Sequence, residues 1–117
     1  MSRRVLAKAS EVPPGSCKIV TAMGREIGLF NIGGEFFALA NRCPHRGAEL
    51  CRGMIVGLVG SDGPGSYKLS KPGEFIRCPW HGWEFEIPTG ICLADPRFRL
   101  QTFPVAVENG ILTVTLP

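Results

Sequence analysis

Hydrophobic residues in this chain occur in short runs that are separated by glycine, proline and other turn-forming residues. No window of eleven or more residues has a clean helical period, and short runs of this kind are typical of strands. We therefore predict strands over residues 4–8, 17–22, 26–32, 35–40, 75–77, 84–87, 98–107 and 111–116.

Two pairs of residues predict tight hairpins between neighbouring strands. Gly33-Gly34 separates the apolar positions of 26–32 from those of 35–40, and Asn109-Gly110 does the same near the C-terminus. Turns of this length need a positive φ at both central residues, which glycine and asparagine adopt most readily. Both parts of the chain are therefore predicted to be antiparallel, and the fold class is all-β, a meandering sandwich or small barrel.

Length and composition predict one ordinary globular domain. The chain has 117 residues, enough for a single core, and its 15 glycines and 10 prolines agree with many turns. We expect one domain over 1–117. The formal net charge of +3 and the lack of a long basic run argue against nucleic acid as a partner.

The same composition bears on location and on the cysteines. No stretch approaches the roughly 18 apolar residues of a membrane span. The first residues do not form the apolar core of a signal peptide either. We expect a soluble, cytoplasmic protein without a membrane partner, whose five cysteines stay reduced instead of forming a disulfide framework.

The chemistry lies in two short segments that each place one cysteine and one histidine in a glycine-ended turn. These are Cys43-Pro44-His45-Arg46-Gly47 and Cys78-Pro79-Trp80-His81-Gly82, and they hold the only two histidines of the chain. Proline followed by glycine reverses the chain, so the two ligands of a segment can point the same way. The pattern predicts a metal site with Cys43, His45, Cys78 and His81 as ligands.

Two metals fit two thiolates and two imidazoles. A tetrahedral zinc site is one alternative, and it would make the chain a zinc-binding interaction domain. Zinc modules usually pair cysteine with cysteine and histidine with histidine, whereas each segment here offers one of each. That arrangement favours a 2Fe-2S cluster with two cysteines on one iron and two histidines on the other.

The segments 41–48 and 78–85 closely resemble the C-x-H and C-x2-H motifs of Rieske 2Fe-2S proteins. The resemblance extends more loosely from about Val5 to Leu116. It implies antiparallel sheets that form a base, with a cluster-binding subdomain inserted over about 41–95. It also implies that Cys43 and Cys78 hold the inner iron, and that His45 and His81 hold the outer iron.

The resemblance also places the chain in the low-potential ferredoxin branch. Respiratory Rieske proteins carry an extra cysteine in each ligand loop and hydroxyl groups near the cluster. The corresponding positions here are Ala48, Trp80, Trp83 and Phe85. The remaining cysteines are expected to be core or surface thiols instead of ligands; they are Cys17, Cys51 and Cys92.

Three further features of the sequence bear on the proposed cluster. Residues 55–74 lengthen the separation of the motifs and predict an extended, exposed loop. Trp80 and Trp83 are expected to pack around the cluster and exclude water. Arginines around the first motif (Arg42, Arg46 and Arg52) are either solvated or able to dock an acidic partner.

The functional hypothesis is a one-electron carrier that is not itself an enzyme. By the resemblance, its electron donor is a flavin-dependent reductase and its acceptor a terminal oxygenase, of the aromatic-ring-hydroxylating type. The chain has neither the length nor the histidines for a second, catalytic iron domain. The alternative with the same cofactor is the small Rieske-fold subunit of a nitrite reductase.

Overall fold

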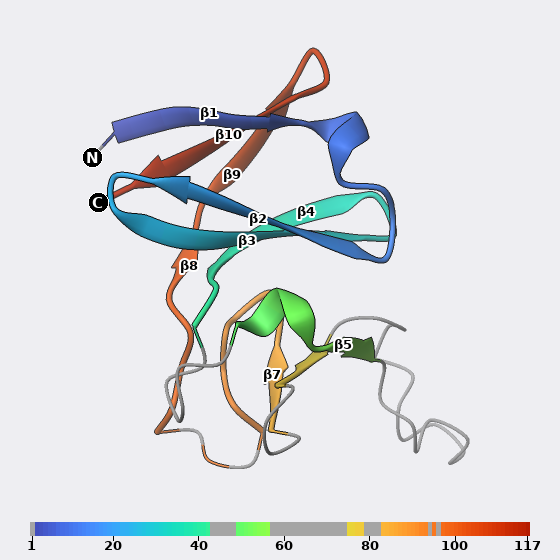
Figure 1. The fold of residues 1–117 in the computed structure, drawn as a ribbon, viewed down its shortest axis with the longest axis vertical. Helices are drawn as coiled ribbons and strands as arrows, with labels where there is room; N and C mark the ends of the chain where they lie inside the picture. The colour runs from blue at the N-terminus through green and yellow to red at the C-terminus, as the bar shows by residue number, and fades with distance from the viewer. Residues whose placement is uncertain (1, 43–48, 57–74, 79–82, 94, 96) are drawn as a thin grey trace.

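The computed structural model describes residues 2–42, 49–56, 75–78, 83–93, 95 and 97–117, with the backbone alone at residues 54 and 56. These residues form strands and two short 3-10 helices (Figure 1). In chain order they are β1 (Ser2–Lys8), η1 (Ala9–Glu11), β2 (Ser16–Ala22), β3 (Arg25–Ile32), β4 (Glu35–Ala40), η2 (Leu50–Arg52), β5 (Met54–Val56), β6 (Phe75–Arg77), β7 (Glu84–Glu86), β8 (Thr102–Phe103), β9 (Val105–Glu108) and β10 (Ile111–Leu116). The predicted all-β fold is confirmed.

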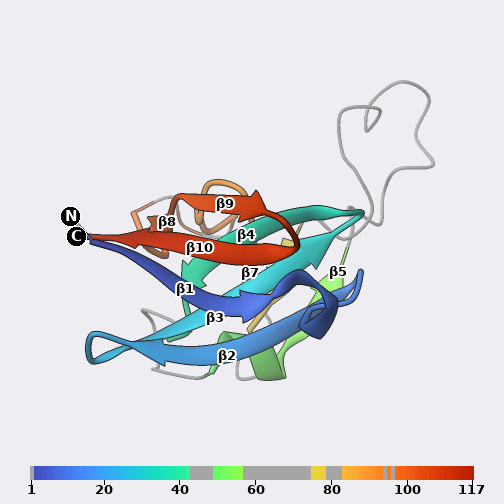
Figure 2. The same cartoon turned by 90° about the horizontal axis from the view of Figure 1, so that it is seen from above.

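The strands form three antiparallel sheets, with strand orders β1-β10-β9, β2-β3-β4-β8 and β5-β6-β7. In Figure 1 the second sheet lies between the first sheet and the part of the chain that holds η2, β5 and β7. Figure 2, from above, shows β1, β9 and β10 lying across the same strands. The segment from η2 to β7 falls in sequence between β4 and β8. It is therefore inserted into a two-sheet base, as the resemblance implied.

Strand β3 is buried on both faces because it lies in the middle layer. Ile27 and Leu29 face the core between the two base sheets, while Phe30 faces a second core shared with the inserted subdomain. Alternate residues of a strand point to opposite faces, so one strand supplies both cores. The first core contains Ala7, Val12, Ile27, Leu29, Ala38, Phe103, Leu112, Val114 and Leu116. The second contains Phe30, Leu39, Leu50, Ile76, Cys78, Phe85, Ile87, Cys92 and Leu100.

Both predicted hairpin turns are present. Gly33 and Gly34 have φ angles of 61° and 95°, and Asn109 and Gly110 have 52° and 75°. These positive values match the twist of the strands that they join. The β2–β3 turn, Met23-Gly24, also has two positive φ angles, and it was not predicted because methionine rarely adopts that conformation.

Two predicted elements differ from the structure. The strand predicted over 98–107 begins only at Thr102 and is interrupted at Pro104, which has no N–H for a ladder. The chain changes sheets there, because β8 pairs with β4 whereas β9 pairs with β10. The prediction of a loop over 55–74 is wrong at its first two residues, because Ile55 and Val56 belong to β5, which pairs with β6. Residues 57–74 lie outside the described residues.

The expectation that Cys17 and Cys51 are free thiols is wrong. Cys17 of β2 and Cys51 of η2 form a disulfide, with their Cα atoms 5.4 Å apart. Cys17 lies opposite Phe30 in the β2–β3 register and packs against the second core, as does Cys51. The packing of η2 against β2 thus brings together two residues that are 34 positions apart. Cys92 is a buried free thiol, as expected.

No helix among the described residues is long and apolar enough to cross a membrane.

Candidate metal centre

The second predicted ligand segment is closed by the β6–β7 hairpin. Arg77 ends β6 and lies opposite Glu84, the first residue of β7. Directly inside this pair, the Cys78 N–H donates to the carbonyl of Trp83 at 2.7 Å. The Arg77 guanidinium also donates to Glu84 Oε2, from Nη2 at 2.8 Å and from Nε at 3.1 Å. The ends of segment 78–83 are therefore held together by backbone and side chains.

Cys78 is the one predicted ligand among the described residues. It is a free cysteine with 3% exposure, and it belongs to the core that the subdomain shares with the middle sheet. A buried thiol of this kind is a soft ligand protected from solvent, which suits iron–sulfur coordination. Cys43, His45 and His81 lie outside the described residues.

The first ligand segment is closed around the buried side chain of Asn41. The Asn41 carbonyl accepts from the N–H of Leu50 at 2.7 Å, and its Oδ1 accepts from the N–H of Cys51 at 2.9 Å. Its Nδ2 donates to Oε1 of Glu26 on β3 at 3.1 Å. Asn41 is 1% exposed, and satisfying each polar group offsets the cost of burying it. This asparagine ties the entrance and exit of the loop to the base.

Both ligand segments share a frame that the sequence analysis missed. Each begins with Arg-Cys-Pro and ends with a glutamate seven positions after the arginine. The structure pairs these residues in both cases, as an isolated antiparallel bridge between Arg42 and Glu49 and as strand partners Arg77 and Glu84. The repeated spacing of arginine and glutamate was the sequence signal for this frame.

The two frames differ in the ion pairs that their arginine and glutamate side chains form. Arg42 forms an ion pair with Glu26 of β3 at 3.1 Å, and Glu49 forms one with Arg52 at 3.0 Å. Hydrogen bonding from Asn41, helped by the charge of Arg42, lowers the pKa of Glu26 from its ordinary value of 4.5. Arg42 and Arg52, considered earlier as solvated or docking residues, thus both contact carboxylates. Arg46 is not among the described residues.

The chain that follows the first frame contacts the second frame at Arg77. Its backbone pairs with Met54 of β5 on one side and with Glu84 on the other. Gly53, which follows η2, lies so close that a side chain there would collide with the Arg77 carbonyl. The chain that leaves the first ligand segment therefore packs directly against the residue before Cys78.

Aromatic residues pack beside the second segment. The ring of Trp83 meets that of Phe98 edge to face, with centroids 5.2 Å apart, and both pack against the shared core. Trp83 thus packs against the core that contains Cys78, and its expected exclusion of water from a cluster stays a prediction. Trp80 lies outside the described residues. Phe85 is fully buried in the same core. Phe98 is held by a loop in which Arg97 donates to Asp95 and lowers the pKa of that carboxyl.

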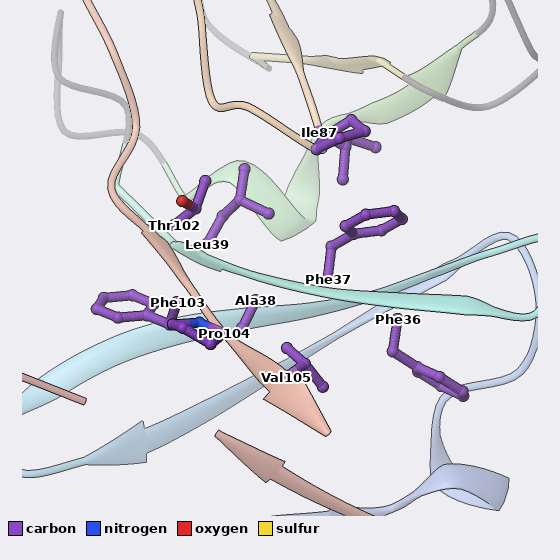
Figure 3. Close-up of a pocket in the computed structure, with 10 residues that line it drawn as sticks. Phe36, Phe37, Ala38, Leu39, Ile87, Thr102, Phe103, Pro104 and Val105 are labelled. Atoms are coloured by element: carbon purple, nitrogen blue, oxygen red, sulfur yellow. The ribbon is translucent and has the colours of Figure 1, made fainter. Parts of the chain in front are cut away.

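A cavity of about 390 Å³ lies where β4 meets β8 and β9 (Figure 3). Phe37 and Leu39 point toward Ile87 of the subdomain, and Phe36 points away from it. The described residues that line the cavity carry no ionisable group or thiol. The described part of the chain likewise contains no group of three or more metal-binding side chains. The ligand segments therefore remain the candidate site.

The chain matches a known family model and is similar along its whole length to a known ferredoxin subunit. The family model described as the Rieske [2Fe-2S] domain matches residues 2–104. The 3-phenylpropionate/cinnamic acid dioxygenase ferredoxin subunit of Escherichia coli (strain K12) is 31% identical, over 100% of this chain and 96% of the relative.

Two solved structures illustrate the similarity in fold. The ferredoxin of Sphingomonas yanoikuyae B1 has a TM-score of 0.77 and 27% identity, covering 99% of this chain and all of that one. A protein described as the NADH-dependent nitrite reductase small subunit of Mycobacterium tuberculosis has a TM-score of 0.78 and 25% identity, covering 97% and 93%.

Proposed function

Because the chain belongs to the Rieske [2Fe-2S] domain family, we propose that it is a one-electron carrier whose cluster is held by Cys43, His45, Cys78 and His81. The observation that carries the ligand assignment is the pair of matching Arg-Cys-Pro frames, each of which encloses one cysteine and one histidine. The burial of the free thiol of Cys78 supports it. When bound, the cluster supplies a site that takes up and releases one electron.

The protein residues have separate tasks in this proposal. Cys43 and Cys78 provide thiolates to the inner iron, and His45 and His81 provide imidazoles to the outer iron. The core around Cys78 and Phe85 excludes water from the protein side of the site. Hydrogen bonds and nearby charges then tune the cluster, as outer groups do at metal sites generally.

We further propose that the chain delivers electrons to a terminal oxygenase, of the aromatic-ring-hydroxylating type, after receiving them from a flavin-dependent reductase. The full-length similarity to a dioxygenase ferredoxin subunit supports this role. In this proposal the chain carries electrons and is not itself an enzyme. It is a cytoplasmic protein with a single domain over 1–117, whose cluster-binding part spans about 41–95.

A nitrite reductase small subunit is the second candidate, favoured by the similarity to the Mycobacterium tuberculosis structure. The two roles differ in the electron acceptor and can be separated directly. The ferredoxin of the Escherichia coli dioxygenase system can be replaced by this chain in an assay with that system's reductase, oxygenase and NADH. Substrate oxidation that depends on this chain supports the oxygenase role. Electron delivery to a sirohaem nitrite reductase, without delivery to the oxygenase, would favour the other.

The ligand assignment can be tested by comparing substitutions of Cys78, a proposed ligand, with a substitution of Cys92, a buried free cysteine that is not a proposed ligand. We expect about two irons and two sulfides per purified chain, and the rhombic electron paramagnetic resonance spectrum of a reduced Rieske cluster. Cys78→Ser and His81→Ala should abolish both, whereas Cys92→Ser should retain them, because Cys92 occupies the same core without being a ligand. Stoichiometric zinc without iron would instead support the zinc-binding alternative.

A further inference from the structure

We propose that Arg77 and Glu84 form a positioning pair for the second ligand segment, and that their opposite charges balance each other beside the cluster. This inference rests on the proposed ligand set, because Cys78 and His81 lie within the segment that the pair closes. It concerns two residues that do not bind iron themselves.

The geometry places the pair at the base of the segment. Arg77 and Glu84 are strand partners, and the hydrogen bond from Cys78 to Trp83 lies immediately inside them. Their side chains are 41% and 26% exposed, so the ion pair is only partly screened by water. Both guanidinium nitrogens that contact Glu84 reach the same oxygen, which fixes the side chain of Arg77 over the hairpin.

Arg77 is held from the other side as well. Its backbone pairs with Met54, and its carbonyl packs against Gly53, which follows the first ligand segment. The residue before Cys78 therefore has little freedom to shift. A substitution in the Arg77–Glu84 pair should therefore shift the backbone of the second ligand segment. Through the contact with Gly53, it should also shift the chain that follows the first ligand segment.

The charges have a predictable effect on electron affinity. Reduction adds one negative charge to the cluster, so a nearby positive charge favours the reduced form and a negative charge disfavours it. In the intact pair these effects oppose each other. Removing the charge of Glu84 leaves Arg77 unbalanced and should raise the reduction potential, whereas removing that of Arg77 should lower it.

The opposite signs separate this role from simple structural support. If the pair only stabilised the hairpin, both single substitutions would loosen the same segment, and the potential would move in one direction or not at all. Arg3 and Glu108 provide a matched control, because they form an ion pair between β1 and β9 of the base with a 3.7 Å separation.

The experiment compares Arg77→Gln, Glu84→Gln, the double substitution, the charge swap R77E/E84R, and the controls Arg3→Gln and Glu108→Gln. Protein-film voltammetry should give a higher potential for Glu84→Gln, a lower one for Arg77→Gln, and values near that of the unmodified protein for the double variant and both controls.

Cluster retention tests the positioning role. In the presence of an iron chelator, the double variant should lose its visible spectrum several times faster than the unmodified protein, and the charge swap should regain much of the retention. Single variants that shift the potential the same way, or not at all, would overturn the inference. An unmodified protein without a Rieske spectrum would instead overturn the proposed function, so the two failures are distinguishable.

Discussion

Cys17 and Cys51 are joined by a disulfide that connects the middle sheet of the base to the short helix following the first ligand segment. The backbone N–H groups of Leu50 and Cys51 also donate hydrogen bonds to the carbonyl and side-chain oxygens of Asn41. The exit of that segment is therefore attached to the base by one covalent bond and two hydrogen bonds. Neither cysteine is a proposed iron ligand, so the link and the cluster can be tested separately.

We predict that Cys51→Ser leaves the cluster intact but lowers the free energy of unfolding. Closing a loop of 34 residues restricts the unfolded chain, and removing such a link typically costs about 2–4 kcal/mol. Denaturant unfolding of the cluster-free chain measures this change. A thiol reductant should destabilise the original chain by a similar amount and leave Cys51→Ser unaffected. Loss of the visible spectrum in Cys51→Ser would show that this cysteine is a ligand.

Gly28→Ala is predicted to destabilise the protein by about 1–3 kcal/mol, because it overpacks a filled space. A Cβ atom at residue 28 would lie 3.0 Å from Cys51 Sγ and 3.2 Å from Cys17 Sγ, with the ring of Phe30 equally close. Thermal unfolding provides the measurement. In a background where both cysteines are alanine, the same substitution should cost less. An equal cost in the two backgrounds would rule out crowding by the disulfide.

The reduction potential is predicted to lie near the low end of the Rieske range, closer to about −150 mV than to about +300 mV at neutral pH. A donor hydrogen-bonded to a cluster sulfur would favour the reduced form and raise the potential. Phe85 has no such donor, and Trp83 packs its ring against Phe98. Voltammetry at neutral pH checks this, and a value above about +100 mV would contradict it.

The lowered pKa of Glu26 predicts that its ionised carboxylate adds to the free energy of unfolding, and that this contribution is lost in acid. Its pKa is lower in the folded protein than the ordinary 4.5, so folding favours the ionised form. The contribution is present above 4.5 and declines as the pH falls through the lowered pKa. Glu26→Gln should therefore weaken the pH dependence of unfolding below pH 4.5, and the free energies of unfolding of the two proteins should converge as the pH falls. Parallel profiles would refute this role of the Asn41 and Arg42 contacts.

Much of the base could be predicted from the sequence because its signals are local. Alternating apolar residues and the Gly33-Gly34 and Asn109-Gly110 turns determine strands whose neighbours are also their sequence neighbours. The strand β5 was missed because three residues give too little pattern, and it forms through pairing with β6. The change of sheets at Pro104 similarly depends on partners distant in sequence.

The sequence motifs predict the ligands of the site, whereas the residues that support its two segments were not predicted. Cysteine and histidine residues at this spacing indicate metal binding, because their side chains are metal ligands. Asn41, Gly53 and the Cys17–Cys51 disulfide act through contacts that arise only once the sheets are assembled. The assignment of Cys43, His45, Cys78 and His81 as ligands stays a prediction.

The two-sided burial of β3 limits how this protein can diverge. Leu29 and Phe30 are consecutive residues that serve different cores. Inserting or deleting one residue within β3 would exchange the inward-facing sets, placing Phe30 between the base sheets and withdrawing it from the subdomain. We therefore expect insertions and deletions within β3 to be rare among related proteins, although β3 contains no proposed ligand. The core of the inserted subdomain includes Phe30 and Leu39 of the middle sheet, so we expect the subdomain to lose its packing if it is transferred to another scaffold without them.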